Sequence, residues 1–199
     1  MLNFGIDLDG VCFDLQDIVD WYNKSYLTSF TKKDFLSPDF CDKFNIVYNV
    51  LERRVRKMYR TVGFRNFTPA PESVSGVREL SRIGRTLAVT SRPSWAHEDT
   101  YYCLRANFNG AFNGGVHFTR NWHFKDNGQD LQTKLDVCIK EGVSYLLEDD
   151  LHYALPCAEN GVKVLLFDYY GNSTLHENVH KVYSWPEAVA KIKELEGFK

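Results

Sequence analysis

Short apolar runs alternate with amphipathic stretches along this 199-residue chain, and no other feature restricts its fold as much. Runs of this length suit strands that are buried on both faces, and the stretches between them suit helices. The alternation predicts an α/β fold, in which helices cover both faces of a parallel sheet. The predicted strands are Leu2–Asp7, Thr86–Thr90, Gly115–Phe118, Tyr145–Leu147, Lys163–Phe167 and, with a weaker pattern, Lys181–Tyr183.

The first two predicted strands are separated by a long insertion, residues 14–78, that shows helical spacing and no strand pattern. We predict that it forms a small helical cap over the end of the first strand. Residues 1–13 and 79–199 would then form the catalytic core. The proline-containing segment Thr68–Glu72 interrupts the helical pattern and is the predicted hinge. A final helix is predicted to open at Trp185.

The composition limits the compartment and the partners of the chain. Hydrophobic residues make up 44% of it, so it can bury a core and fold alone. A net charge of −2 gives no overall attraction to nucleic acid or to an anionic membrane, so neither is expected as an obligate partner. The five cysteines form no C-x-x-C pair, which predicts reduced thiols and a cytoplasmic location. The sequence shows no signal peptide and no stretch that is apolar enough to span a bilayer.

Two carboxylates, Asp7 and Asp9, lie at the end of the first predicted strand and are followed by Gly10. Like charges this close repel unless a cation or a proton holds them together. Two carboxylates and a backbone carbonyl suit Mg²⁺, which leaves room in its coordination shell for a phosphate. The pattern therefore predicts Mg²⁺-dependent chemistry on a small phosphorylated substrate.

In an open parallel sheet, ligands bind beyond the carboxyl ends of the strands, so polar residues at these ends should be considered together. Asp7 is the predicted nucleophile on phosphorus, and Asp9 is the predicted proton donor and acceptor. A hydroxyl group, backbone N–H groups and a lysine bind phosphate oxygens. The residues that offer these groups are Thr90, Ser91 and Lys134.

Two further sets of residues have more than one possible role. Arg92 could reach a phosphate or a sugar, or it could cap local structure. The acidic run Glu148, Asp149 and Asp150 ends a later strand and would complete the Mg²⁺ site with Asp7 and Asp9. Within that run Asp149 is the preferred ligand, followed by Glu148 and Asp150.

These motifs, in this order, resemble those of the haloacid dehalogenase (HAD) superfamily of aspartate-nucleophile phosphatases over nearly the whole chain. The resemblance implies a Rossmann-like core, dependence on Mg²⁺, an aspartyl-phosphate intermediate and a cap that selects the substrate. The short interval from Lys134 to Glu148 is similar to that of the 5′-nucleotidase group, which includes the 5′(3′)-deoxyribonucleotidases. Glu148 departs from the usual Asp-Asp pair of that group. The resemblance therefore predicts a phosphomonoesterase for nucleoside monophosphates. Another phosphorylated metabolite or a nucleic-acid 3′-phosphate is the alternative substrate.

Two other patterns suggest different functions. His176–His180 matches the H-E-x-x-H string of zinc proteases, which requires a helix, but its flanks predict a loop that runs into a strand. A basic face at Arg53–Arg60 lies opposite an apolar stripe at helical spacing. It is either the solvated side of an amphipathic helix or a contact for a charged substrate or a nucleic-acid end. A phosphate-binding protein without catalysis is the remaining alternative.

Overall fold

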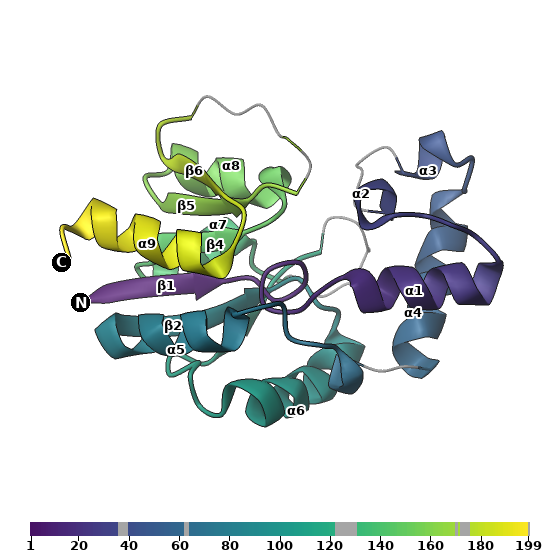
Figure 1. Cartoon of the computed structure of the whole chain (residues 1–199), viewed down its shortest axis with the longest axis horizontal. Helices are drawn as coiled ribbons and strands as arrows, with labels where there is room; N and C mark the ends of the chain where they lie inside the picture. The colour runs from purple at the N-terminus through teal and green to yellow at the C-terminus, as the bar shows by residue number, and fades with distance from the viewer. Residues whose placement is uncertain (36–39, 62–63, 122–130, 170, 172–175, 199) are drawn as a thin grey trace.

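The computed structural model describes the chain except residues 36–39, 62–63, 122–130, 170, 172–175 and 199 (Figure 1). Its described part contains a six-stranded parallel sheet in the order β3-β2-β1-β4-β5-β6. β1 lies near the centre, so its carboxyl end has strand neighbours on both sides. The strands are β1 (Leu2–Ile6), β2 (Gly84–Thr90), β3 (Val116–Phe118), β4 (Tyr145–Glu148), β5 (Lys163–Phe167) and β6 (Val179–Val182).

Helices cover both faces of the sheet, as the sequence predicted (Figure 1). One face packs against α5, α6 and α9, and the other packs against α7 and α8. None of the helices in the described residues is long and apolar enough to cross a membrane. The helices are α1 (Gln16–Tyr26), α2 (Lys32–Phe35), α3 (Phe40–Lys43), α4 (Tyr48–Thr61), α5 (Ser73–Ile83), α6 (His97–Phe108), α7 (Lys134–Lys140), α8 (Leu151–Glu159) and α9 (Trp185–Glu196), with short 3-10 turns η1 (Phe64–Asn66) and η2 (Ser94–Ala96).

The continuous apolar runs fit this arrangement because successive strand residues point to opposite faces. In β4, Tyr145 and Leu147 pack on the side of α5 and α9, whereas Leu146 packs on the side of α7 and α8. The predicted α/β class is confirmed. The last strand differs from its prediction, because β6 begins at Val179, where the chain already pairs with Val164 of β5.

The helices α1 to α4 lie to one side of the sheet, beyond the carboxyl end of β1 (Figure 1). The chain leaves the core and returns to it along two adjacent segments. Phe13 forms an antiparallel bridge with Pro69, and the N–H of Asp14 donates to the carbonyl oxygen of Thr68 at 3.0 Å. The segment predicted as a hinge therefore lies beside the start of the insertion. The predicted boundary at residue 78 falls inside α5, which packs on β2 and α9.

Candidate active site

The loop after β1 presents Asp7 at the carboxyl edge of the sheet. The N–H of Asp7 donates to the carbonyl oxygen of Leu147 in β4 at 2.9 Å, which fixes the backbone against the neighbouring strand. Gly10 has a φ of 88°, a conformation that favours glycine. A Cβ atom at Gly10 would overlap the carboxylate of Asp149. The glycine turn therefore allows the acid that follows β4 to pack directly against the loop that follows β1.

Lys134 is the first residue of α7 and is held there by a capping box. The Thr133 side chain accepts from the N–H of Asp136, whose carboxylate accepts from the N–H of Thr133. The buried Nζ of Lys134 lies 2.8 Å from Oδ1 of Asp7 and 2.6 Å from Oε2 of Glu148. It also lies 4.4 Å from the ring centroid of Tyr153. The sequence-predicted lysine thus joins the ends of β1 and β4.

Asp7, Glu148 and Asp149 form a buried cluster in which one carboxylate oxygen of each lies within 4.8 Å of the others. Burial raises the pKa of Asp7 and of Asp149, and it raises the pKa of Glu148 to about 8. The neighbouring carboxylates add to these increases, and Lys134 opposes them. Burial alone would lower the pKa of Lys134, but the charges of Asp7 and Glu148 raise it well above its usual value.

The ionised form of this cluster would not be balanced by the protein groups in it. Three ionised carboxylates would outnumber the single ammonium group, and buried charges are stable only when they are paired, neutralised by protons or bound to a metal. Carboxylate oxygens are the donors that Mg²⁺ prefers in proteins. The donor set therefore fits the divalent cation that the sequence predicted.

The two other predicted metal ligands direct their carboxylates elsewhere. Asp150 caps α8, where its Oδ1 accepts from the N–H of His152 at 2.8 Å. Asp9 is paired with Arg92, whose Nε and Nη2 donate to its two oxygens at 2.8 and 2.6 Å. The guanidinium group that was expected to reach a phosphate is therefore engaged with a carboxylate. Asp9 remains next to Asp7 in the same loop, and its side chain is 25% exposed.

Thr90 and Ser91 lie at the carboxyl end of β2, beside β1 in the sheet. Thr90 is buried, and its hydroxyl oxygen accepts from the N–H of Arg92 at 3.3 Å. The hydroxyl groups of Ser91 and Thr119 lie 3.2 Å apart, and the N–H of Thr119 donates to the carbonyl oxygen of Thr90 at 2.8 Å. Thr119 was not predicted, although it is the first residue after the predicted third strand.

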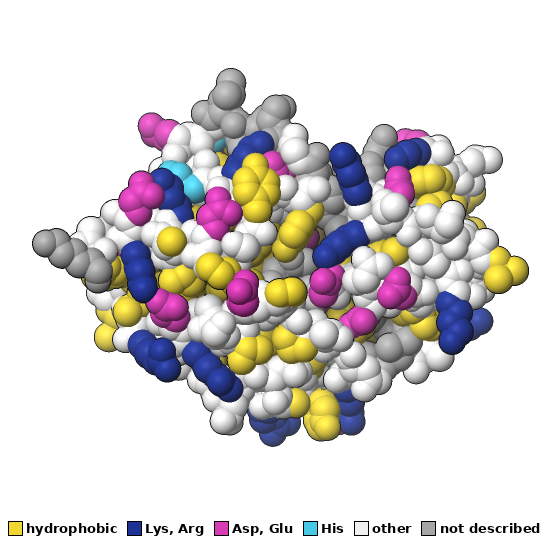
Figure 2. Space-filling model, in the orientation of Figure 1, with side chains coloured by type: hydrophobic (Ala, Val, Ile, Leu, Met, Phe, Trp, Pro, Cys, Tyr) yellow, Lys and Arg dark blue, Asp and Glu magenta, His cyan; other side chains and the backbone are white. Residues whose placement is uncertain are grey.

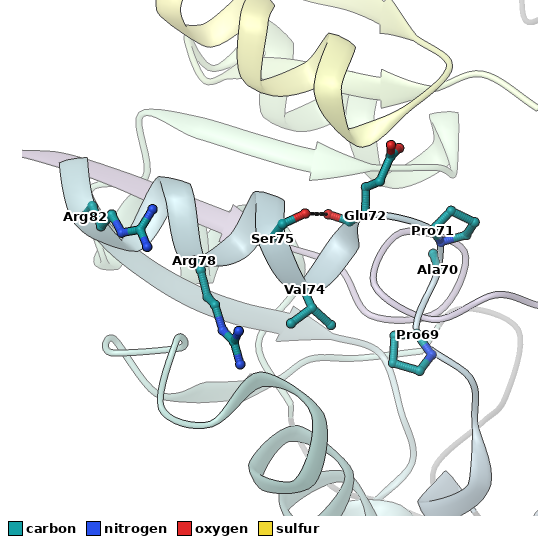
Figure 3. A pocket seen from close by; sticks show the side chains of 8 residues that line it. All are labelled: Pro69, Ala70, Pro71, Glu72, Val74, Ser75, Arg78 and Arg82. Atoms are coloured by element: carbon teal, nitrogen blue, oxygen red, sulfur yellow. Dashed lines mark hydrogen bonds between the residues drawn. The ribbon is translucent and has the colours of Figure 1, made fainter.

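Two cavities lined by described residues lie away from this site. A cavity of about 560 Å³ lies along α5 and the returning hinge segment, and none of the predicted site residues lines it (Figure 3). Its lining residues include Glu72, Arg78 and Arg82, which are spaced along α5 from its start to its end (Figure 3). The buried acid cluster, rather than cavity volume, identifies the candidate active site.

The predicted basic face on α4 is present but smaller than expected. A second cavity, of about 370 Å³, lies along this helix and is lined by Asn49, Glu52, Arg53, Arg56, Lys57 and Arg60. Arg54 points instead into the cap, where it donates to the hydroxyl oxygen of Tyr22 at 2.7 Å. Arg56 pairs with Glu52, and its guanidinium carbon lies 5.9 Å from the ring centroid of Trp95, an exposed residue of η2 outside the cap. On the face shown in Figure 2, acidic and basic side chains are spread over both the core and the cap.

The H-E-x-x-H string does not form a zinc-protease site. His180 belongs to β6, and His176 precedes a turn in which the N–H of Asn178 donates to its Nδ1 at 3.2 Å. Two histidines four residues apart lie one turn apart on a helix, where they can share a metal ion, whereas along an extended chain they are about 13 Å apart. The predicted loop that runs into a strand is thus confirmed.

Comparisons with known proteins agree with this architecture. No family model matches the sequence. A curated relative, a nucleotidase from Clostridium acetobutylicum, is 26% identical over 201 residues, which cover 98% of this chain and 95% of the relative. A predicted phosphatase from the same organism has a solved structure with a TM-score of 0.67 at 16% identity, covering 97% of this chain and 98% of that one.

A haloacid dehalogenase-like family hydrolase from Streptococcus pneumoniae is similar to the same extent. Its TM-score is 0.66 at 15% identity, and the match covers 96% of this chain and 98% of that chain. These likenesses show that the chain has the fold of the haloacid dehalogenase-like hydrolases. The resemblance predicted from the motifs is confirmed at the level of the fold.

Proposed function

We propose that this protein is a Mg²⁺-dependent phosphomonoesterase that forms an aspartyl-phosphate at Asp7 and acts on nucleoside monophosphates. One observation carries the proposal: the buried Lys134 ammonium group joins Asp7 to Glu148, and Asp149 completes an acid cluster beside them. This is the arrangement that phosphoryl transfer at an aspartate requires, because it supplies a nucleophile, a cation site and a fixed positive charge.

The reaction takes two steps. In the first, a carboxylate oxygen of Asp7 attacks phosphorus, the bond from phosphorus to the leaving oxygen breaks, and Asp9 gives that oxygen its proton. In the second, water attacks phosphorus, Asp9 takes the proton of the water, and the bond between phosphorus and Asp7 breaks. Inorganic phosphate leaves, and both carboxyl groups return to their starting states.

The remaining polar groups would hold the substrate and the cation. Asp7 and Asp149 are the proposed Mg²⁺ ligands. Asp7 and Glu148 both pair with Lys134, but the carboxylate of Glu148 also accepts from the N–H groups of Asp149 and Asp150, each at 3.2 Å, so both of its oxygens are already engaged. The ion would neutralise charge on the transferring phosphoryl group. Thr90 and Ser91 would bind phosphate oxygens from the end of β2, next to Asp7.

A nucleotide substrate is supported by the resemblance to the 5′-nucleotidase group and by the nucleotidase that matches along nearly the whole chain. The basic face of α4 supports a second candidate, the 3′-phosphorylated end of a nucleic acid. Arg53, Lys57 and Arg60 line a cavity there, and Trp95 could stack on a base.

An activity panel separates these substrates. Nucleoside monophosphates, sugar phosphates and 3′-phosphorylated oligonucleotides would be assayed with Mg²⁺ and with EDTA, with Asp7→Asn as the blank. We expect Mg²⁺-dependent release of phosphate that favours the mononucleotides. A preference for the oligonucleotides would support the second candidate. Turnover of none of the three classes would contradict the phosphatase function.

A further inference from the structure

Arg92 makes a contact with Asp9 that fixes both the position and the plane of the carboxylate. Its Nε donates to Oδ2 and its Nη2 donates to Oδ1, at 2.8 and 2.6 Å. Arginine is suited to this two-bond contact because its donors are coplanar and fixed relative to one another. Arg92 is 2% exposed, whereas the side chain of Asp9 is 25% exposed. The arginine is thus held inside the core, and the acid keeps a surface that a substrate can reach.

The core holds Arg92 in place from a second direction. Its Nη1 donates to the hydroxyl oxygen of Thr100 at 3.3 Å, and that hydroxyl donates to the carbonyl oxygen of Ala96 at 2.8 Å. Its backbone N–H donates to the hydroxyl oxygen of Thr90 at 3.3 Å. Four of its nitrogens, the three of the guanidinium group and the backbone N, therefore donate to protein groups in β2, α6 and the β1 loop.

The guanidinium group of Arg92 also lies close to two aromatic rings in the segments that connect core and cap. Its central carbon lies 5.1 Å from the ring centroid of Phe13 and 5.7 Å from that of Phe67. Phe13 and Phe67 belong to the two segments that connect core and cap, which pair at Phe13 and Pro69. The packing of these two segments is therefore in contact with the guanidinium group that holds the carboxylate of Asp9.

We propose that Arg92 is a positioning residue, which orients Asp9 for proton transfer and links that orientation to the hinge, and that it does not bind the phosphate of the substrate. The inference rests on the proposed phosphatase function. It predicts that loss of the two-bond contact impairs proton delivery to the leaving group and leaves the binding of the phosphoryl group intact.

Dependence on the leaving group tests this role. Wild-type protein and Arg92→Lys would be assayed with Mg²⁺ on substituted phenyl phosphates whose phenols differ in acidity, and on an alkyl phosphomonoester. Lysine keeps the charge but cannot make the two-bond contact. We expect kcat for the alkyl ester to fall about 100-fold and kcat for the most acidic phenol to fall less than about 5-fold, since a good leaving group needs no proton. KM and inhibition by inorganic phosphate should stay near wild type.

Three further variants keep the test independent of folding. Thr100→Val and Phe67→Leu each remove one support of Arg92 and should give smaller losses with the same dependence on the leaving group. Arg85→Lys is the matched control, because Arg85 pairs with Glu141 at the opposite end of β2. It should leave both kinds of ester unaffected. Thermal melts would establish that each variant is folded.

The outcomes separate the inference from the proposed function. An active wild type with an Arg92→Lys loss that is uniform across leaving groups, or with a raised KM and weaker phosphate inhibition, overturns the positioning role and leaves the phosphatase proposal standing. Faster turnover in Arg92→Lys also overturns it, because the contact would then restrain Asp9. A wild type that hydrolyses none of these esters and none of the nucleoside monophosphates, sugar phosphates and 3′-phosphorylated oligonucleotides overturns both.

Discussion

The carboxyl edge of the sheet and the cap both carry charged residues, but among the described residues several of those at the edge are buried and those of the cap are not. Asp7, Glu148, Asp149 and Lys134 are buried at the ends of β1, β4 and α7. In the cap, Arg53 and Lys57 are exposed, and the ion pair of Lys43 with Asp34 is largely solvated. Exposed pairs contribute little to stability, whereas buried charges must be matched closely. This difference supports the proposal that the chemistry takes place at the edge of the sheet and that the cap selects the substrate.

Loss of the nucleophile should have the largest effect. Asp7→Asn should lower phosphatase activity by at least about 1,000-fold, since the amide cannot form the acyl phosphate. The measurement is phosphate release under saturating Mg²⁺, and a thermal melt establishes that the variant is folded. Full activity in folded Asp7→Asn would move the chemistry away from the buried edge.

Loss of the second cation ligand should have the next largest effect. EDTA should abolish activity and added Mg²⁺ should restore it, whereas Asp149→Asn should raise the Mg²⁺ concentration needed for half activity by about 10–100-fold. Asp150→Asn is the matched control, because Asp150 caps α8 and lies outside the cluster. Equal Mg²⁺ requirements in the two variants would contradict the assignment of Asp149.

The buried acids should also make the metal-free protein less stable as the pH rises. The pKa of Glu148 is raised to about 8, and a glutamate in the unfolded chain titrates near its ordinary value of about 4.3. Between these values the native state holds protons that the unfolded chain has released, so the free energy of unfolding falls with increasing pH. We expect Tm in EDTA to fall by roughly 5–10 °C from about pH 5 to about pH 8.

Mg²⁺ provides the control for that experiment. Saturating Mg²⁺ should remove most of the fall in Tm, because the cation binds the native state and compensates its surplus negative charge. Asp149→Asn should show a smaller fall without the ion. A Tm in EDTA that is constant or rises over this range would contradict the burial of excess acid.

The smallest effect is expected in the cap. Lys57→Glu on the basic face of α4 should raise KM for an anionic nucleotide about 2–5-fold and leave kcat near its wild-type value, because an exposed charge contributes mainly to encounter and binding. Lys24→Glu, an exposed cap lysine on α1, is the matched control and should change neither constant. If both variants behave alike, the α4 face does not contact the substrate.

The difference between the buried edge of the sheet and the exposed cap also explains what could be predicted from the sequence. The strands and the residues at their ends were predictable, because apolar runs define the sheet and parallel topology brings the ends of β1, β2 and β4 together. This placed Asp7, Lys134 and Asp149 correctly in one cluster. The prolines around Pro69 marked the segment that returns to the core, but the pairing of that segment with Phe13 was not predicted.

Contacts that depend on side-chain packing were not predictable. The pairing of Arg92 with Asp9 joins residues far apart in the sequence, and no spacing rule describes it. Asp150 and Asp149 are adjacent and chemically identical, and only the start of α8 separates a helix cap from a member of the cluster. Tyr153 reaches Lys134 because α7 packs on α8. In the cap, exposed side chains follow no pattern that specifies a substrate.

The covalent intermediate at Asp7 gives the most direct test of the account. Enzyme and substrate would be mixed for a single turnover, quenched with borohydride, which reduces an acyl phosphate to an alcohol, and mapped by mass spectrometry. We predict homoserine at position 7 in the wild-type protein and unreacted aspartate when substrate is omitted. Reduction to the alcohol at another acidic residue, or unmodified Asp7 in samples that release phosphate at the wild-type rate, would contradict the central claim.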